Sequence, residues 1–255
     1  MLVDSLLRPL FTPLLKRLFR IEVSGVENIE AAGDRVVIIA NHLSFLDPII
    51  LAAFVPGKPT FAINVYQADK WYFNWLDKLA TLYRLDPLKP LSMKRMIQDL
   101  RPDSKGTGEK TVNKVIIFPE GRISTSGGIM KIYEGAGMLL EKTGATLVTA
   151  RIDGTQYSKM SRMGGKLRLR WFPKIRLTFM PPVPFEKNST VPAATIYRHM
   201  TEAALHTSLT RQSFLEAALQ AYEVHGGKQP IACDIARIDM NYRQFWRNAW
   251  HALKW

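Results

Sequence analysis

The chain has 255 residues, of which 47% are hydrophobic and 22% are charged, a composition typical of a globular protein rather than a disordered one. A single cysteine, Cys233, excludes an intramolecular disulfide framework and a cysteine-rich zinc site, and the five histidines lack the paired spacing of metal ligands. The net charge of +13 predicts an anionic partner: a nucleic acid, a phospholipid surface or an acidic protein. No apolar stretch reaches the ~20 residues of a membrane-spanning helix.

The first 20 residues have the pattern of a basic amphipathic helix, in which leucine and phenylalanine recur at helical spacing. Its cations are Arg8, Lys16, Arg17 and Arg20. Such a helix can lie in a bilayer interface with its cations toward anionic headgroups, or it can pack on the protein's own core. Pro9 and Pro13 predict a break or a kink. We favour the interfacial interpretation because the charge of the segment agrees with that of the whole chain.

Short β-branched runs alternate with helical patterns along the rest of the chain. The predicted strands are 35–40, 115–118, 146–152 and 175–180. The predicted helices are 48–55, 70–82, 91–100, 130–143 and 193–221. Residues 101–114 are polar and contain glycine, which predicts a surface loop. The alternation predicts an α/β fold with a central, mostly parallel or mixed sheet flanked by helices.

The first candidate site follows the first predicted strand, where the sequence reads Asn41-His-Leu-Ser-Phe-Leu-Asp-Pro48. His42 and Asp47 would diverge by about 140° on one continuous helix. They can meet if the chain turns between them and a helix starts near Ser44, which forms a capping-box pattern with Asp47. A carboxylate on one ring nitrogen would fix the tautomer and leave the other nitrogen to take a proton from a substrate hydroxyl. The alternative is that Asp47 caps the helix and His42 is an ordinary loop residue.

A second candidate site follows the strand predicted at 115–118. Its residues include Glu120, Gly121, Arg122 and Ser124, and Lys131 follows shortly after. Glycine lets the backbone approach a ligand, amides and hydroxyls donate hydrogen bonds, and arginine can bind an oxyanion bidentately. The pattern predicts a phosphate-binding turn that is not a Walker A loop. The alternative is an ordinary turn with solvated charges.

Together the two segments resemble the glycerophospholipid acyltransferases, which carry an Asn-His-x4-Asp block followed by a Phe-Pro-Glu-Gly block. In that family the histidine is the general base, the aspartate is its partner, and the Glu-Gly block binds the phosphate of the acceptor. The resemblance implies these roles for His42, Asp47, and Glu120 with Gly121. Arg122 follows directly, where many members place a threonine before the arginine.

More narrowly, residues 118–124 and 130–137 resemble the amino-terminal acyltransferase part of bacterial bifunctional 2-acylglycerophosphoethanolamine acyltransferase/acyl-carrier-protein synthetases. Two other family blocks are weaker here, and Arg151 is the candidate anion contact that remains near them. We interpret residues 1–20 as a membrane-interface helix, 21–210 as an acyltransferase domain, and 211–255 as a helical tail. In the bifunctional relatives this tail would lead into the synthetase, and the two open interpretations are that the synthetase is excised from this sequence or that the protein has lost it.

The resemblance implies transfer of a fatty acyl group from acyl carrier protein or coenzyme A to the free hydroxyl of a lysophospholipid, in membrane phospholipid repair. The implied acceptor is 2-acyl-glycerophosphoethanolamine, with lysophosphatidate as the alternative. A thioester is already activated, so we expect no metal and no cofactor. Backbone amides near Ser44 are the expected oxyanion donors. The implied location is peripheral or monotopic, on the cytoplasmic face of a bacterial inner membrane.

A different class of function rests on the basic segment 151–187, which interleaves Trp171 and Phe172 with cations. The cations are Arg151, Lys159, Arg162, Lys166, Arg168, Arg170, Lys174, Arg176 and Lys187. Such a segment can bind nucleic acid, lie at a lipid headgroup interface or receive an acidic carrier protein. The two acyltransferase blocks favour the membrane or the carrier over nucleic acid. A non-catalytic protein that binds lipid or nucleic acid remains the rival prediction.

Overall fold

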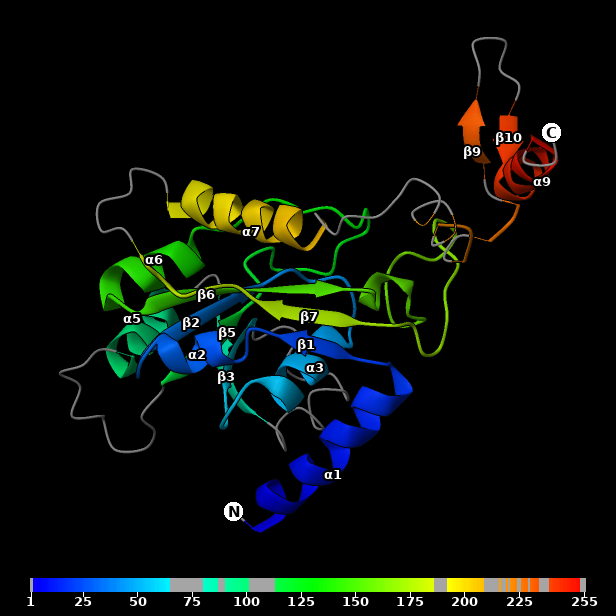
Figure 1. The fold of residues 1–255 in the computed structure, drawn as a ribbon. Coiled ribbons are helices and arrows are strands. Elements are labelled where there is room, and N and C mark those ends of the chain that lie inside the picture. The colour runs from blue at the N-terminus through cyan, green and yellow to red at the C-terminus, as the bar shows by residue number, and fades with distance from the viewer. Residues whose placement is uncertain are drawn as a thin grey trace.

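The chain forms an eight-stranded mixed sheet between two layers of helices in the computed structural model (Figure 1). The structure describes residues 2–64, 80–86, 90–100, 113–185, 192–208, 216, 219, 221–223, 226–228, 230–233 and 239–252. The strands of the sheet are β1 (Glu22–Ser24), β2 (Val36–Ala40), β3 (Thr60–Asn64), β4 (Thr81–Leu85), β5 (Lys114–Ile117), β6 (Thr146–Asp153), β7 (Arg176–Phe179) and β8 (Val183–Pro184). The helices around it are α1 (Leu2–Leu18), α2 (Glu27–Ala31), α3 (Asp47–Phe54), α5 (Pro90–Asp99), α6 (Gly135–Thr143) and α7 (Pro192–Ser208).

The strand order is β1-β7-β6-β2-β5-β3-β4, and β8 pairs with β6 beside this path. The central strand β2 is parallel to both β5 and β6, and β3 is parallel to β4 and β5. Two strands, β7 and β8, run antiparallel to β6. All five residues of β2 are buried, as expected for a parallel strand that is covered on both faces. The predicted α/β fold with a mostly parallel, mixed sheet is confirmed.

Alternate residues of β2 enter two separate hydrophobic clusters. Ile38 packs in the cluster formed with α1, α2 and α3, whereas Ile39 packs in the cluster formed with α5, α6 and α7. Figure 1 shows this division for four of the helices, with α1 and α3 on one side of the sheet and α6 and α7 on the other. The polar residues that follow β2 therefore emerge at the end of a strand that both layers hold in place.

All four predicted strands are present as β2, β5, β6 and β7, with ends that shift by at most two residues. The helices predicted at 48–55 and 91–100 are α3 and α5. The helix predicted at 193–221 is α7 as far as residue 208, and most of the remainder lies outside the described residues. The strands β1, β3, β4 and β8 were not predicted. The strands β1 and β8 have only three and two residues, and no residue of β4 is fully buried.

Three predicted segments need correction. Residues 70–79 of the helix predicted at 70–82 lie outside the described residues, but residues 81 and 82 belong to β4. The surface loop predicted at 101–114 lies outside them as far as residue 112, and Lys114 begins β5. The helix predicted at 130–143 begins at Gly135, because the amides of Met130 and Tyr133 bond to the preceding turn instead.

The predicted amino-terminal helix is confirmed as α1, which continues through Pro9 and Pro13 without a break. Both prolines are exposed, so the helical hydrogen bonds that proline cannot donate are lost on the solvent side of α1 rather than in the core. The guanidinium of Arg8 donates to the carbonyl oxygens of Ala53, Val55 and Gly57 at the end of α3. Arg8 therefore holds the protein's own backbone and is not directed at headgroups. None of the described helices is both long and apolar enough to cross a bilayer.

The carboxyl-terminal tail is only partly helical. It contains a two-stranded antiparallel sheet, β9 (Pro230–Cys233) with β10 (Asp239–Asn241), followed by the helix α9 (Tyr242–Ala252). The tail contacts the main body where the Arg170 guanidinium donates to the Glu223 carbonyl. The predicted boundaries of the three segments remain a prediction.

Two glycines with positive φ provide a test of backbone fit. A Cβ on Gly154 (φ +100°) would lie 2.0 Å from the Lys174 carbonyl oxygen, whereas a Cβ on Gly33 (φ +83°) would meet nothing within 4 Å. We expect Gly33→Ala to lower the free energy of unfolding by about 1 kcal/mol through left-handed strain alone. Gly154→Ala should cost at least ~2 kcal/mol more because of the clash. Urea unfolding of both variants measures the difference, and equal losses would contradict the close approach.

Candidate active site

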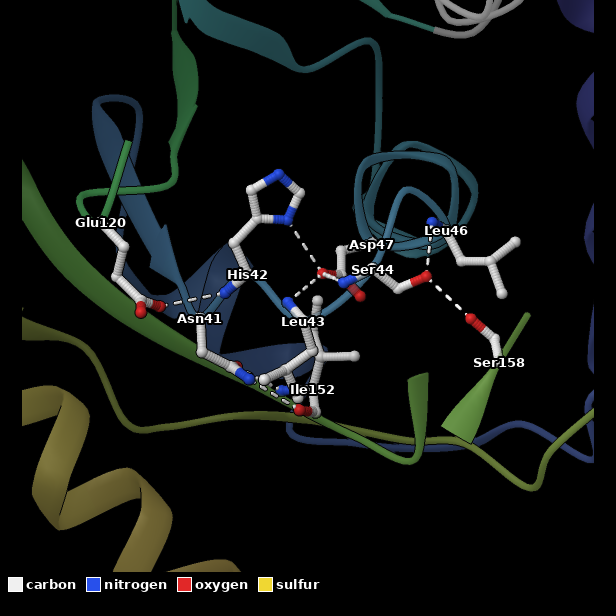
Figure 2. A network of polar contacts seen from close by, with 9 residues as sticks. All are labelled: Asn41, His42, Leu43, Ser44, Leu46, Asp47, Glu120, Ile152 and Ser158. Carbon is white, nitrogen blue, oxygen red and sulfur yellow. Dashed lines mark hydrogen bonds and ion pairs between the residues drawn. The ribbon is translucent and has the colours of Figure 1, made fainter. Parts of the chain in front are cut away.

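The site begins at Asn41, the first residue after β2. Its side-chain amide donates to the Ile152 carbonyl at 2.8 Å, and its side-chain oxygen accepts from the Ile152 N–H at 2.8 Å (Figure 2). The side chain thus takes the place of a backbone peptide and extends the pairing of β2 with β6 beyond Ala40. The backbone itself is free to leave the sheet at the next residue, His42.

The side chains of His42 and Asp47 are in direct contact. The Nδ1 atom of His42 lies 3.0 Å from Oδ2 of Asp47, which is fully buried as the first residue of α3. The same Oδ2 accepts hydrogen bonds from the N–H groups of Leu43 at 2.6 Å and Ser44 at 2.7 Å. A single carboxylate oxygen therefore both closes the turn and orients the imidazole (Figure 2).

The helix starts at Asp47, one residue before the predicted range of 48–55 but three residues after Ser44, where the capping-box pattern placed its start. Only half of the capping box is present. The Asp47 carboxylate reaches back to the Ser44 N–H, but the Ser44 hydroxyl accepts from the Leu46 N–H and bonds to the Ser158 hydroxyl at 2.9 Å. Ser158 belongs to the loop after β6, so the turn is tied to that loop.

The backbone amides near Ser44 are not available as oxyanion donors, which corrects our expectation. Those of Leu43 and Ser44 donate to Asp47, and those of Leu46 and Asp47 donate to the hydroxyl and carbonyl of Ser44. The Phe45 N–H donates to the Met160 carbonyl at 3.2 Å. Every amide from residue 43 to residue 47 is thus held within the protein.

The imidazole of His42 is fixed on a second side by an aromatic ring. It stacks on Phe118, with ring centroids 4.1 Å apart and an interplanar angle of 20°. The His42 side chain is 16% exposed, and Figure 2 shows its second ring nitrogen pointing away from Asp47. That nitrogen, Nε2, is the atom through which the ring can exchange a proton with a substrate.

Glu120 joins the two predicted segments. Its carboxylate is buried and accepts from the His42 N–H at 3.1 Å through Oε1 and from the Met130 N–H at 2.9 Å through Oε2. Burial raises the pKa of the Glu120 carboxyl, and the two backbone hydrogen bonds oppose that shift. Glu120 is 1% exposed and each of its oxygens accepts a backbone hydrogen bond, so it holds the backbone of His42 in place.

The turn around Gly121 presents cations on an exposed surface. Gly121 has φ +64° and donates its N–H to the Phe118 carbonyl, and a Cβ there would lie 3.2 Å from the Tyr133 ring. Arg122 is exposed and forms no hydrogen bond or ion pair with a described residue. Lys131 is exposed and lies 5.6 Å from the centroid of the Tyr133 ring. Arg122 and Lys131 are therefore the predicted ligand contacts that keep a charged group available.

Ser124 and Arg151 are occupied elsewhere. The Ser124 side chain is buried, its hydroxyl donates to the Gly128 carbonyl, and it accepts from the Gly127 N–H. Its own N–H donates to the His42 carbonyl at 2.7 Å. Ser124 thus shapes the turn and attaches it to His42, and it presents no hydroxyl to a ligand. Arg151, the further candidate anion contact, forms an ion pair with Asp153 at 2.7 Å.

Within the described residues, no three His, Cys, Asp or Glu side chains group as a metal site would require. The roles of Asn41, Phe118 and Ser158 were missed by sequence reasoning. Asn41 carried a signal, since an amide directly after a buried strand can imitate a peptide group. Phe118 and Ser158 carried none, because their contacts with His42 and Ser44 join segments far apart in the chain.

The sequence is similar to known acyltransferases. The sequence matches the Acyltransferase family over residues 20–153. It is 28% identical over 144 residues to a chloroplastic 1-acyl-sn-glycerol-3-phosphate acyltransferase of Arabidopsis thaliana, covering 54% of this chain and 37% of that protein. A chloroplastic enzyme of the same name from Brassica napus is 27% identical over 144 residues, which are 54% of this chain and 38% of that protein. The chain thus spans less than two fifths of these curated relatives.

The fold has a counterpart among solved structures. The 1-acyl-sn-glycerophosphate acyltransferase PlsC from Thermotoga maritima superimposes with a TM-score of 0.61 and 21% identity, over 82% of this chain and 83% of that chain. This likeness concerns the fold alone. The family match covers more than half of the chain and includes both polar turns. The chain therefore belongs to the acyltransferase family.

Proposed function

We propose that the protein transfers a fatty acyl group from a thioester to the free hydroxyl of a lysophospholipid. The observation that carries the proposal is the contact of His42 Nδ1 with the buried Asp47 carboxylate, which leaves Nε2 for the substrate. The acceptor oxygen attacks the thioester carbonyl while Nε2 takes its proton. The carbon–sulfur bond then breaks, and the imidazolium returns the proton to the leaving thiolate. Asp47 stabilises the imidazolium between these steps.

The phosphate of the acceptor is assigned to the exposed cations beside this dyad. Arg122 can bind a phosphate bidentately and Lys131 can add a second positive charge. Gly121 supports the turn through its positive φ. A direct role for the Glu120 carboxylate is unfavourable, because an anion repels a phosphate and both of its oxygens accept backbone hydrogen bonds. Glu120 therefore acts through the backbone.

Two acceptors and two donors fit this chemistry. The narrower sequence resemblance favours 2-acyl-glycerophosphoethanolamine, whereas the relatives are named for 1-acylglycerol-3-phosphate. Both carry a phosphate beside a free hydroxyl, and acyl carrier protein or coenzyme A can supply the thioester. We place the reaction at a bilayer surface, on the cytoplasmic face of an inner membrane if the chain is bacterial. The proposal requires no metal or cofactor.

The acceptor lipid can be identified with purified protein, labelled acyl thioesters and a panel of lysophospholipids. We expect transfer to 2-acyl-glycerophosphoethanolamine or to lysophosphatidate, measured as labelled diacyl product. Supplying the label on acyl carrier protein and on coenzyme A in parallel identifies the donor. Binding of lysophospholipid vesicles without any product from either donor would leave only a lipid-binding function.

Removal of the base tests the dyad. We expect His42→Ala to lower kcat by about 10²–10⁴-fold, because the acceptor hydroxyl loses its proton acceptor. The matched control is His206→Ala, which removes an exposed histidine from α7 and should retain the activity of the parent. A kcat for His42→Ala near that of the control would rule out general-base catalysis at this residue.

Removal of the free cation tests the phosphate contact. Arg122→Gln should raise the KM for the acceptor roughly tenfold, the loss of one charge-assisted hydrogen bond, with little change in kcat. The effect should shrink with added salt because the site is exposed. Arg198→Gln on α7 removes a similarly exposed arginine and serves as control. An unchanged KM in Arg122→Gln would remove this residue from the acceptor site.

A further inference from the structure

The helix α1 divides its apolar residues between two surfaces. Leu15 and Phe19 are buried and Phe11 packs beside them in the cluster shared with α3. A second set faces solvent at four-residue intervals: Leu10, Leu14 and Leu18, exposed by 74%, 52% and 40%. We name these three the leucine row. Burial in the protein's own core accounts for the first set and leaves the leucine row unpartnered.

An aromatic pair far along the chain lies at the carboxyl-terminal end of α1. Trp171 is 66% exposed and Phe172 is 50% exposed. The ring of Phe172 meets the ring of Phe19 edge-on, with centroids 5.4 Å apart. Because Phe19 follows the helix directly, the contact places the aromatic pair next to the end of the leucine row. Two segments that are distant in sequence thus contribute exposed apolar groups to one region.

Cations accompany both parts of this surface. Lys16, Arg17 and Arg20 are exposed around the leucine row, and the Lys159 ammonium lies 4.5 Å from the Trp171 ring centroid. The acidic Glu22 nearby is already paired with Lys174 at 2.6 Å. Exposed leucine and tryptophan flanked by cations are the groups that enter an anionic bilayer interface. The cations alone could attract an acidic carrier protein, but a carrier does not explain why five large apolar side chains are exposed to solvent here.

The loop that carries the aromatic pair also holds the catalytic turn. The N–H of Lys159 donates to the Arg170 carbonyl at 3.0 Å, and the Arg170 N–H donates to the Tyr157 carbonyl at 2.7 Å. From the same stretch, Ser158 bonds to Ser44 at 2.9 Å and Met160 accepts from the Phe45 N–H. Residues 157–160 are therefore bonded to the aromatic segment on one side and to the turn between His42 and Asp47 on the other.

We propose that Trp171 and Phe172 form a second contact with the bilayer, which continues the leucine row of α1 and fixes the position of His42 relative to the membrane surface. The partner is an anionic lipid surface. This inference rests on the proposed function for its consequence in catalysis, but the contact itself does not depend on turnover. Binding and activity therefore test different parts of it.

The binding experiment uses the full chain and vesicles of phosphatidylethanolamine with phosphatidylglycerol. We expect Trp171→Ala/Phe172→Ala to lower the vesicle partition coefficient about tenfold or more. The matched control is Tyr197→Ala/Leu205→Ala, which removes two exposed apolar side chains from α7 on the opposite layer and should bind as the parent does. Partition of the aromatic variant equal to that of the parent, or an equal loss in the control, would overturn the proposal.

Two further arms separate the outcomes. Trp171→Phe/Phe172→Trp keeps an aromatic pair and should restore binding, whereas a folding defect would lower it in every variant. Transfer to a vesicle-bound acceptor should fall in the alanine variant, while transfer to a short-chain, monomeric acceptor should not. Normal vesicle binding with a loss confined to the acyl-carrier-protein donor would overturn the proposal and assign the loop to the carrier. If the parent shows no transfer at all, the proposed function fails and the binding arm still decides the contact.

Discussion

The structure of the site depends on one buried carboxylate oxygen. Oδ2 of Asp47 accepts from two backbone N–H groups and contacts the imidazole of His42, all within a span of six residues. A buried anion is tolerable only when such donors replace water. The turn that supplies the donors is also what brings His42 back to Asp47, which a continuous helix would separate. The hydrogen bonds that satisfy Oδ2 therefore also set the geometry of the dyad.

A second buried carboxylate holds His42 from the opposite side. Glu120 accepts the N–H of His42, Ser124 donates to the His42 carbonyl, and Phe118 covers the ring. The acidic residue of the second turn is thus explained by backbone positioning, and Arg122 is the residue proposed to contact the phosphate. The difference between Glu120 and Arg122 follows from their exposure. Buried polar groups form hydrogen bonds within the protein, whereas an exposed cation can still bind a ligand.

Sequence patterns predicted the features that depend on local order. The continuous apolar run of β2 identified a buried strand, and the polar residues after it identified the dyad. The patterns failed where long-range contacts decide the outcome. The helix α6 starts at Gly135 because amides before it donate hydrogen bonds to the turn at residues 118–121. The Phe45 N–H is likewise unavailable to a substrate because it donates to the Met160 carbonyl. Among the described strands, the edge strand β4 pairs with β3 alone, and its own sequence does not reveal that pairing.

The helix α3 connects α1, the helix proposed to contact the bilayer, to the pair formed by His42 and Asp47. Its first residue is Asp47, and the carbonyl of Ala53 near its other end accepts from Arg8 and Thr12 of α1. With eight residues at 1.5 Å each, α3 spans about 12 Å. Helical hydrogen bonds make that distance rigid, so a bilayer that holds α1 also sets the height of the carboxylate. The loop at residues 157–160 fixes the other side of the same turn. These two connections add to the contacts of Glu120, Ser124 and Phe118, and together they fix the orientation of His42.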